Sequence, residues 1–416
     1  MVKRWLLGVA VAFLLVSSCG GGGSTAQSPP PPPPPLTGWY DLGGELNAVV
    51  GRSGGWAYLS DLAGSPVAIW EEYDESALVY RVYSKRWNSG AWQTLGSGPE
   101  SGAMNDNVLR SASAPYLFLG DQFLYATLKE KDANDVEQAS VKRWDPAGGA
   151  WVPVGPSLNV LPDHTSYDPV GVFFEGTPVV AVNSTDGVSV FRKVYVRRLK
   201  GATWENVGAP LSGAPDEIAS RQFLVSTPGK LHVAWKETKP VGSGGYAASW
   251  DNVSGWSLLG EWADPGASGI NRHYLAASPA SELYLSSVEQ IGFQTYVLVK
   301  RWNPAADPPV WEPVGPAVND NVDTSRATVS QVRFVGGAPW VAFSEDRGDV
   351  PAIVVKRWDG AVGAWVPVGG VVNPDPARAA RDPQMAVISG VVHLVGLQDS
   401  ATDPPYQEVF VRFWQP

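Results

Sequence analysis

Charged residues recur along this chain in a pattern that could bind a ligand or hold a fold together. Six arginines each stand just before the expected inner strand of a repeated segment. Six acidic residues each stand at the end of the second strand of the same segment. The arginines are Arg52, Arg110, Arg221, Arg272, Arg326 and Arg381, and the acids are Glu72, Glu130, Glu237, Glu289, Glu345 and Asp399. In one further segment Tyr167 and Ser184 occupy the two places, so both exceptions fall together. The coincidence predicts that the arginine and the acid of one segment interact.

Two interpretations of this pattern are open. In the first, each planar guanidinium bonds its carboxylate and nearby loop carbonyls, so that the set is a structural ring. In the second, the same residues and Tyr167 line ligand pockets, where they bond sugar hydroxyls or an anionic group while Trp70, Trp235 or Phe343 stacks on the ligand. Regular recurrence favours the structural role. A single asymmetric site would lie where the pattern breaks, near Tyr167 and Ser184.

The elements that carry these residues are indicated by a repeated hairpin. The stretch "SVKRWDPAGGAWVPVGP" at 140–156 returns as "VVKRWDGAVGAWVPVGG" at 354–370. The residues that close its first strand are Trp87, Trp144, Leu199, Trp250, Trp302, Trp358 and Trp414, and those that open its second are Trp39, Trp92, Trp151, Trp204, Trp256, Trp311 and Trp365. The period of about 54 residues is typical of repeat architectures. Val-rich runs broken by Gly and Pro predict four strands in each repeat, two of them at 169–175 and 177–182 in the third.

The two ends of the chain carry complementary halves of this hairpin. "VFVRFW" at 409–414 has no second strand after it, and "WYDLGG" at 39–44 has no first strand before it. A ring of repeats closes when one completes the other, which resembles the terminal closure of β-propellers. The sequence therefore predicts an all-β, seven-bladed β-propeller of four-stranded antiparallel blades over 38–416, closed by the strand around Trp39.

The hairpin turns, such as "WDGAVGAW" and "WNSGAW", resemble loosely the Asp-box turns of sialidase-type propellers and are similar to Kelch-like repeats. Asp or Asn would cap the turn, and the indoles would fill the space between blades. We therefore expect a packing role for the tryptophans, the alternative being platforms for sugar stacking. The resemblance implies that a ligand binds on the opposite face, where loops enter each inner strand and turns leave each second strand.

Catalytic motifs are not evident in the sequence. A sialidase resemblance would imply an early Arg-Ile-Pro motif and a Tyr–Glu nucleophile pair, and neither is found. No nucleophile elbow, phosphate loop or metal spacing appears, and His232 and His393 occupy equivalent strand positions that suggest core residues. The Asn-Asp-Asn stretches at 105–107 and 319–321 fit turns better than a calcium loop. The sequence thus predicts no enzyme, no cofactor and no metal.

The N-terminus carries export and anchoring signals. Residues 1–18 combine Lys3 and Arg4 with an apolar run and small residues before Cys19, the one cysteine of the chain. This pattern resembles a bacterial lipoprotein signal, which implies cleavage, lipidation of Cys19 with acyl chains such as palmitate, and, with Gly20 next, the outer membrane of the cell envelope. Gly, Ser and seven consecutive prolines make 19–37 a tether.

The net charge of −10 argues against binding to nucleic acid or to anionic lipid surfaces. The function that the sequence favours is a lipid-anchored, monomeric propeller that binds a glycan or protein ligand without catalysis. The alternatives are a scaffold subunit of an envelope complex and a diverged sialidase-like glycosidase.

Overall fold

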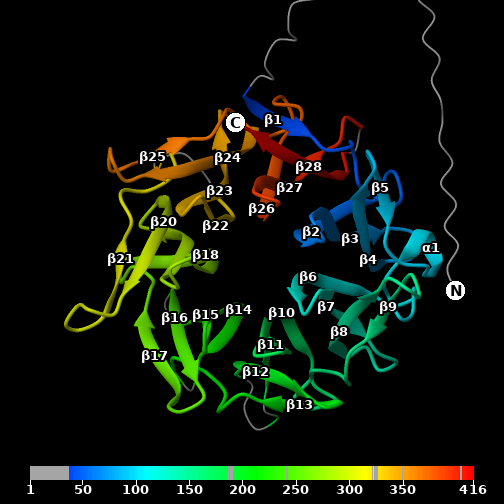
Figure 1. The fold of residues 1–416 in the computed structure, drawn as a ribbon, viewed down its shortest axis with the longest axis horizontal. Helices are drawn as coiled ribbons and strands as arrows, with labels where there is room; N and C mark the ends of the chain where they lie inside the picture. The colour runs from blue at the N-terminus through cyan, green and yellow to red at the C-terminus, as the bar shows by residue number, and fades with distance from the viewer. Residues whose placement is uncertain are drawn as a thin grey trace, which may run out of the picture. The chain divides into compact units, whose positions relative to one another are not determined.

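The computed structural model describes residues 37–185, 187, 191–214, 216–239, 242–320, 322, 327–348, 350–402 and 405–416. Cys19, most of the proposed tether and Arg326 lie outside these residues. The compact unit that carries the fold begins at Thr37. Within it, seven four-stranded antiparallel sheets surround a common axis (Figure 1). The seven-bladed β-propeller predicted from the sequence is confirmed.

Each blade is a meander whose first strand lies at the axis. Blade 1 consists of β2 Ser53–Leu62, β3 Ser65–Asp74, β4 Val79–Asn88 and β5 Ala91–Thr94. Blade 2 consists of β6 Ala112–Gly120, β7 Phe123–Lys131, β8 Glu137–Asp145 and β9 Ala150–Pro153. Blade 3 consists of β10 Ser166–Phe174, β11 Thr177–Ser184, β12 Lys193–Lys200 and β13 Thr203–Asn206. Blade 4 consists of β14 Ile218–Thr227, β15 Lys230–Thr238, β16 Ser243–Asp251 and β17 Gly255–Glu261. Blade 5 consists of β18 Ala267–Ala277, β19 Leu283–Ile291, β20 Gln294–Asn303 and β21 Val310–Pro313. Blade 6 consists of β22 Ser330–Val335, β23 Ala338–Arg347, β24 Val350–Asp359 and β25 Ala364–Pro367.

The seventh blade closes the ring with strands from both ends of the chain. It consists of β26 Ala380–Ile388, β27 Val391–Asp399, β28 Gln407–Gln415 and β1 Gly38–Asp41. Trp39 of β1 pairs with Trp414 of β28, and their ring centroids lie 5.5 Å apart. The indole N–H of Trp39 also donates to the Val368 carbonyl of blade 6, at 2.9 Å. The N-terminal strand therefore completes the last blade as the sequence predicts.

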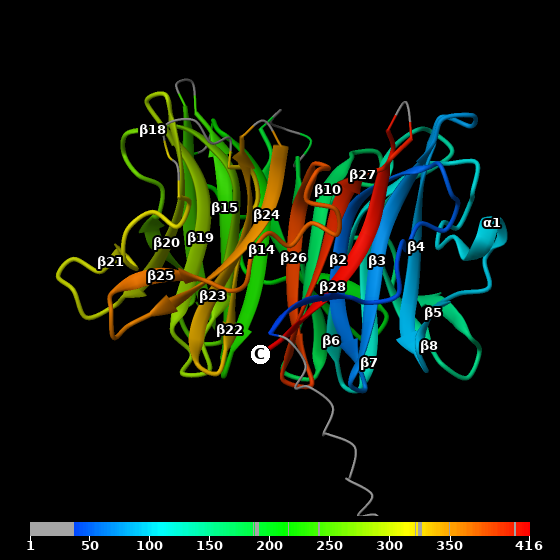
Figure 2. The same ribbon diagram turned by 90° about the horizontal axis from the view of Figure 1, so that it is seen from above.

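Helix contributes almost nothing to the described chain. The one assigned helix, α1 at Pro99–Gly102, lies at the rim of blade 1, and Glu100 and Ser101 within it have non-helical dihedral angles (Figure 2). Among the described residues, no helix is long or apolar enough to cross a membrane.

Apolar packing lies between adjacent blades and not in one central core. One cluster, for example, joins Phe174 and Val179 of blade 3 to Leu224 and Trp235 of blade 4. The side chains of the second strands are the most buried, because each faces a neighbouring blade on both sides of its sheet. Each blade is thus stabilised mainly by its two neighbours, which makes closure of the ring important for all seven.

The hairpin tryptophans are inter-blade contacts, which confirms their packing role. Except for Trp311, whose buried indole N–H has no partner, the second tryptophan of a hairpin donates its indole N–H to a carbonyl after the preceding blade: Trp204 to Pro156 at 3.0 Å and Trp256 to Val207 at 2.6 Å. Its ring packs directly on the glycine of the preceding "PVG" turn. Gly155 has φ of +72°, and a Cβ there would lie 2.8 Å from Nε1 of Trp204, so only glycine fits.

The lysine of the repeated "KRW" stretch links blades in a second way. Lys356 of β24 is 4% exposed, and its ammonium donates to the Val318 carbonyl at 2.6 Å, while the Val318 amide bonds blade 5. Lys85, Lys142, Lys300, Arg197 and Arg412 make the corresponding bonds in five other blades. The hairpin therefore recurs because it attaches its own blade to the preceding one.

Candidate functional site

The residues that face the axis are positioned by β-bulges near the start of the inner strands. The register shifts between Gly55 and Tyr58 in β2, and corresponding shifts occur in β6, β10, β14, β18 and β26. The bulges hold Trp56, Ala114, Asp168, Arg221, Arg272 and Asp382. Several of them have left-handed backbone angles, with φ of +47° at Asp168 and +51° at Arg221. Such bulges re-aim side chains and are common beside functional sites.

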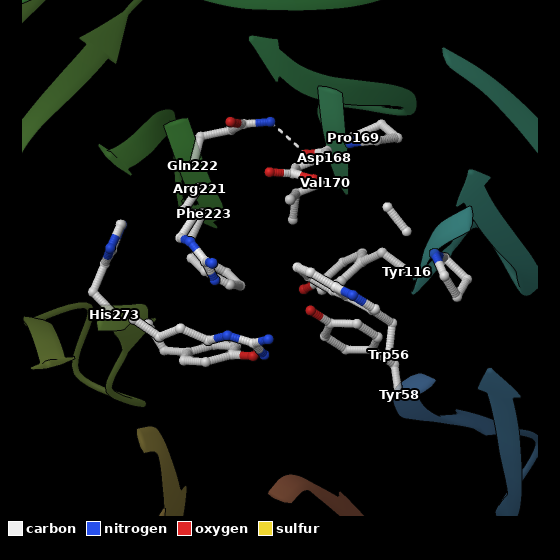
Figure 3. Close-up of a pocket in the computed structure, with 14 residues that line it drawn as sticks. Trp56, Tyr58, Tyr116, Asp168, Pro169, Val170, Arg221, Gln222, Phe223 and His273 are labelled. Carbon is white, nitrogen blue, oxygen red and sulfur yellow. Dashed lines mark hydrogen bonds between the residues drawn. The ribbon is translucent and has the colours of Figure 1, made fainter. Parts of the chain in front are cut away.

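Aromatic residues two positions farther along form a floor across the channel (Figure 3). The rings of Tyr58 and Tyr116 lie 5.0 Å apart, and those of Phe223 and Tyr274 lie 4.1 Å apart. Burial raises the pKa of Tyr58 well above its ordinary value, so its phenol stays neutral. The cavity above this floor measures about 30 Å³, enough for one or two water molecules. A larger ligand must therefore bind above it.

Arg272 spans the channel above the floor. Its guanidinium carbon lies 4.6 Å from the centroid of the Trp56 ring of blade 1. One guanidinium nitrogen lies 3.7 Å from an Asp382 carboxylate oxygen of blade 7. Its side chain is 17% exposed. The stacking and the ion pair hold this cation in place, where it lines both the channel cavity and the hollow described below.

Arg221 occupies the equivalent bulge in blade 4 but has no such partners. Within the described residues its side chain makes no hydrogen bond and no ion pair. Burial and the nearby charge of Arg272 lower its pKa, whereas the charge of Asp168 opposes this effect. Figure 3 shows Arg221 and Asp168 on facing strands around the same cavity. None of its nitrogen atoms is among the fully buried atoms that lack a partner, so its N–H groups are open to water or to a ligand that supplies acceptors.

A polar hollow of about 710 Å³ opens from the two arginines across blades 4 to 7. Its charged lining groups are Arg221, Arg272, Arg381, Glu345, Asp346, Asp382 and Asp399. Arg381 pairs with Asp399 at 3.0 Å, and Glu345 pairs with Arg347 at 2.9 Å. Its volume lies in the range of small-ligand pockets, although its lining is more polar than is usual for them.

The predicted arginines fall into three different places. Arg52 and Arg110 lie in the loops that enter their blades, four residues before the bulge, whereas Arg221 and Arg272 stand in bulges and Arg381 directly precedes one. Arg326 lies outside the described residues. The expectation that each arginine pairs with the acid of its own segment is wrong for Arg52, which bonds Asp74 at 2.5 Å and not Glu72. Among the described residues, the predicted pairing is present in blade 7 alone, between Arg381 and Asp399.

The recurring acids bind the backbone of the loop that enters their own blade. Glu130 accepts the Asp106 and Asn107 amides, both at 2.8 Å, and Glu237 accepts the Gly213 amide at 2.6 Å. Glu72, Glu289 and Glu345 accept the amides of Ala48, Asp264 and Asp320. In blade 7 this place belongs to Gln398, which accepts the Asp375 amide, and not to Asp399. These contacts give the five glutamates a structural role, and their role in ligand binding stays a prediction.

In the blade that breaks the pattern, the described residues around Tyr167 pack against its ring. Its ring is covered by the Arg192 guanidinium carbon at 4.5 Å and the Lys129 ammonium at 5.2 Å. Ser184 is fully buried at the end of β11. The aromatics Trp70, Trp235 and Phe343 are likewise fully buried between blades and cannot stack on a ligand in this structure. We therefore take the channel-mouth residues as the candidate site.

His232 of blade 4 and His273 of blade 5, which lines the channel cavity, are both buried. Burial lowers the pKa of His232 to about 4 and that of His273 to about 3, so both rings are neutral. His232 bonds Thr227 at 2.8 Å, which confirms its core role. Within the described residues, no three His, Cys, Asp or Glu side chains are grouped so that they could hold a metal ion.

Sequence reasoning missed two features. The bulge residues differ from blade to blade, so no recurrence marks them. The second feature is the loop that leads into each inner strand. A recurring asparagine marks this loop at a constant distance after the second tryptophan of the hairpin: Asn47, Asn159, Asn319 and Asn373. In blade 3, Asn159 donates to the His164 carbonyl at 2.7 Å and accepts the Ala139 amide at 2.8 Å, which fixes the loop that leads into the channel.

Glu71, which is 6% exposed next to this site, provides a test of the channel electrostatics. Burial raises its pKa to about 7, although its carboxylate accepts the Ala114 amide at 2.9 Å. Because the folded-state pKa exceeds the unfolded one, its contribution to stability is complete below about pH 4.5 and declines as pH rises through 7. We expect Glu71→Gln to gain stability over the wild type between pH 5 and 8, by about 2–3 kcal/mol at pH 8. Urea unfolding at each pH measures this gain, with exposed Glu205→Gln as control. Parallel stability curves for Glu71→Gln and the wild type would contradict it.

Comparison with known proteins identifies no family for this chain. No family model and no curated protein matches the sequence. Among solved structures, a protein of unknown function from Dyadobacter fermentans aligns at 12% identity, with a TM-score of 0.49, over 74% of this chain and 95% of its own. A Trypanosoma rangeli sialidase in complex with sialic acid aligns at 11% identity and a TM-score of 0.47, over 86% of this chain and 54% of its own. A Penicillium chrysogenum α-L-arabinanase complexed with arabinobiose aligns at 12% identity, with a TM-score of 0.45, over 90% of this chain and 97% of its own.

These alignments correct one expectation. The sequence predicts no enzyme, but the solved propellers that align with it are mainly enzymes: sialidase, arabinanase and a family-43 glycoside hydrolase. The lack of a recognised catalytic motif therefore does not exclude catalysis, and that prediction is wrong as an exclusion. Nor is the sialidase-like alternative favoured, since likeness at this level reflects the shared fold.

Proposed function

We propose that the protein binds a glycan in the polar hollow at the channel mouth. The observation that carries this proposal is Arg221, a partly buried guanidinium without an acceptor among the described residues, which lines both the channel cavity and the hollow. A ligand that supplies acceptor oxygens would satisfy it. Sugar hydroxyl and carboxylate groups are acceptors of the required kind, and the planar guanidinium can bond two adjacent oxygens.

The other groups of the hollow fit the same ligand. Arg272 is fixed by Trp56 and Asp382, so its free N–H groups meet a ligand without loss of side-chain freedom. Asp382 is 29% exposed and can accept hydrogen bonds from sugar hydroxyls. The mouth therefore offers both hydrogen-bond donors and acceptors. This arrangement suits a polyhydroxylated ligand better than a simple anion, because acids outnumber arginines in the lining.

The proposal is tested by glycan-array binding of the purified protein, followed by calorimetric titration of the glycans that bind. We expect saturable, one-site binding of at least one glycan. The same mixtures are assayed for released reducing ends, which decides whether a bound glycan is also cleaved. An array without binding, with capture of a protein ligand in its place, would contradict the proposal.

We propose further that the protein is exported and lipid-anchored through Cys19, as the lipoprotein-like signal suggests. Cys19→Ser should abolish incorporation of labelled palmitate and should move the protein from the membrane to the soluble fraction. Ser18→Ala is the matched control and should remain labelled, because a small residue is kept before the cysteine. Unchanged labelling of Cys19→Ser would show that the acyl chain is attached elsewhere or is absent.

A further inference from the structure

The polar hollow continues outward along the face of blades 5 and 6. A second hollow of about 480 Å³ shares Asn271 and Thr328 with the first. It extends past Gln290 to Phe293, which lies in the turn between β19 and β20. The two hollows together form a groove that begins at Arg221 and Arg272 and ends at Phe293. We call it the blade 5 groove.

Phe293 has no role in holding the fold together. Its side chain is fully exposed, with a relative exposure of 101%, and it follows Gly292, whose φ of +63° makes the turn. The Gln290 amide donates to the Gly292 carbonyl at 3.4 Å and supports this turn. A single exposed apolar residue needs no explanation on its own. This one, however, presents an aromatic face at the end of a polar groove that starts at the proposed binding site.

The rest of the groove has the chemistry to contact a sugar chain. Asn271 and Gln290 are both exposed, and their amides can donate to and accept from hydroxyl groups. Sugar rings also have faces made of C–H groups, which pack on aromatic rings. A ligand limited to one sugar unit at Arg221 would leave Asn271, Gln290 and Phe293 without contact. The channel cavity beneath it cannot take a sugar, since it holds only about 30 Å³.

We propose that the ligand is an oligosaccharide that lies along the blade 5 groove, with one unit at Arg221 and Arg272 and a later unit stacked on Phe293. The inference rests on the proposed glycan binding and specifies its length and direction. Phe293 then sets a preference for longer chains, and the channel-mouth arginines hold the unit that every ligand shares.

The test uses an array of linear glycans of one to six sugar units, neutral and uronic-acid-containing, with the full-length protein. We expect Phe293→Ala to weaken binding of the longer glycans by roughly three- to tenfold and to leave the shortest ligands unchanged. Phe293→Trp should keep or strengthen the preference for length. Val253→Ala is the matched control, because Val253 is 95% exposed in the β16–β17 turn, away from the groove.

The outcomes separate this inference from the proposal beneath it. If Arg221→Ala weakens glycan binding but Phe293→Ala weakens none of the longer glycans, glycan binding stands and the groove inference is overturned. If Phe293→Ala weakens the binding of short and long glycans equally, Phe293 does not contact a later sugar unit, and the groove inference is overturned. If the wild type binds no glycan, both are overturned. Because Phe293 is fully exposed, its substitution should leave the melting temperature unchanged, so that lost binding cannot be attributed to unfolding.

Discussion

Trp39→Ala should lower the free energy of unfolding by about 3–5 kcal/mol, the loss expected for a large buried aromatic. Trp39 is 8% exposed and belongs to the apolar cluster between blades 6 and 7. It also contributes the indole bond to Val368 and the contact with Trp414. Urea denaturation followed by tryptophan fluorescence measures the change. A loss below about 1 kcal/mol would show that β1 does not close the ring.

A double-mutant cycle isolates the closure from the loss of a tryptophan. Trp39 and Trp414 lie at opposite ends of the chain but are directly paired. We expect the variants Trp39→Ala and Trp414→Ala to be non-additive by about 0.5–1.5 kcal/mol. Trp204, in blade 3, is the matched control, since its variant should add to Trp39→Ala without coupling. Additive effects for Trp39 and Trp414 would mean that the two ends do not meet in solution.

Arg221→Ala should weaken glycan binding by about ten- to a hundredfold, because hydrogen bonds to a charged group contribute about 1.5–3 kcal/mol. The same variant should leave the melting temperature unchanged or raise it, since the guanidinium has no hydrogen-bond or ion-pair partner within the described residues to lose. Both effects follow from one feature, a cation placed for a ligand and not for the fold. Calorimetric titration and thermal unfolding measure them on the same preparation.

Two controls accompany the Arg221 variant. Arg357→Ala removes an exposed arginine on the outer strand β24 and should change neither affinity nor stability. Arg221→Lys keeps the charge but not the planar fork, and should recover part of the affinity. If Arg221→Ala lowers the melting temperature by several degrees while affinity persists, the arginine is structural and the site lies elsewhere.

The fold could be predicted from the sequence because its repeating contacts use similar residues in most blades. The tryptophan that bonds the preceding blade and the glycine beneath it recur with the blade period, and the orphan halves at Trp39 and Trp414 indicate closure. Strand ends were less accurate. The strand predicted at 169–175 is β10, which begins at Ser166, because Pro169 sits in the bulge and does not end the strand.

The site could be predicted only in part because it depends on register within the inner strand. Arg221 and Arg272 stand in the bulge and reach the channel, whereas Arg52, four residues before the bulge of its blade, bonds Asp74 at the rim. The sequence pattern, an arginine just before an inner strand, does not distinguish Arg52 from Arg221 and Arg272. The separation from each arginine to the following glutamate is longer for Arg52 than for Arg221, and this difference was the available signal. Phe293 has no counterpart in the repeat that could have marked it.

The most direct test of the account is a crystal structure of the protein with the glycan that binds best on the array. We predict a sugar unit with oxygen atoms within hydrogen-bond distance of the Arg221 guanidinium, above the floor formed by Tyr58 and Tyr116. A glycan bound only at the outer hairpins, or at the opposite end of the channel, would contradict the central claim that the channel-mouth arginines form the binding site.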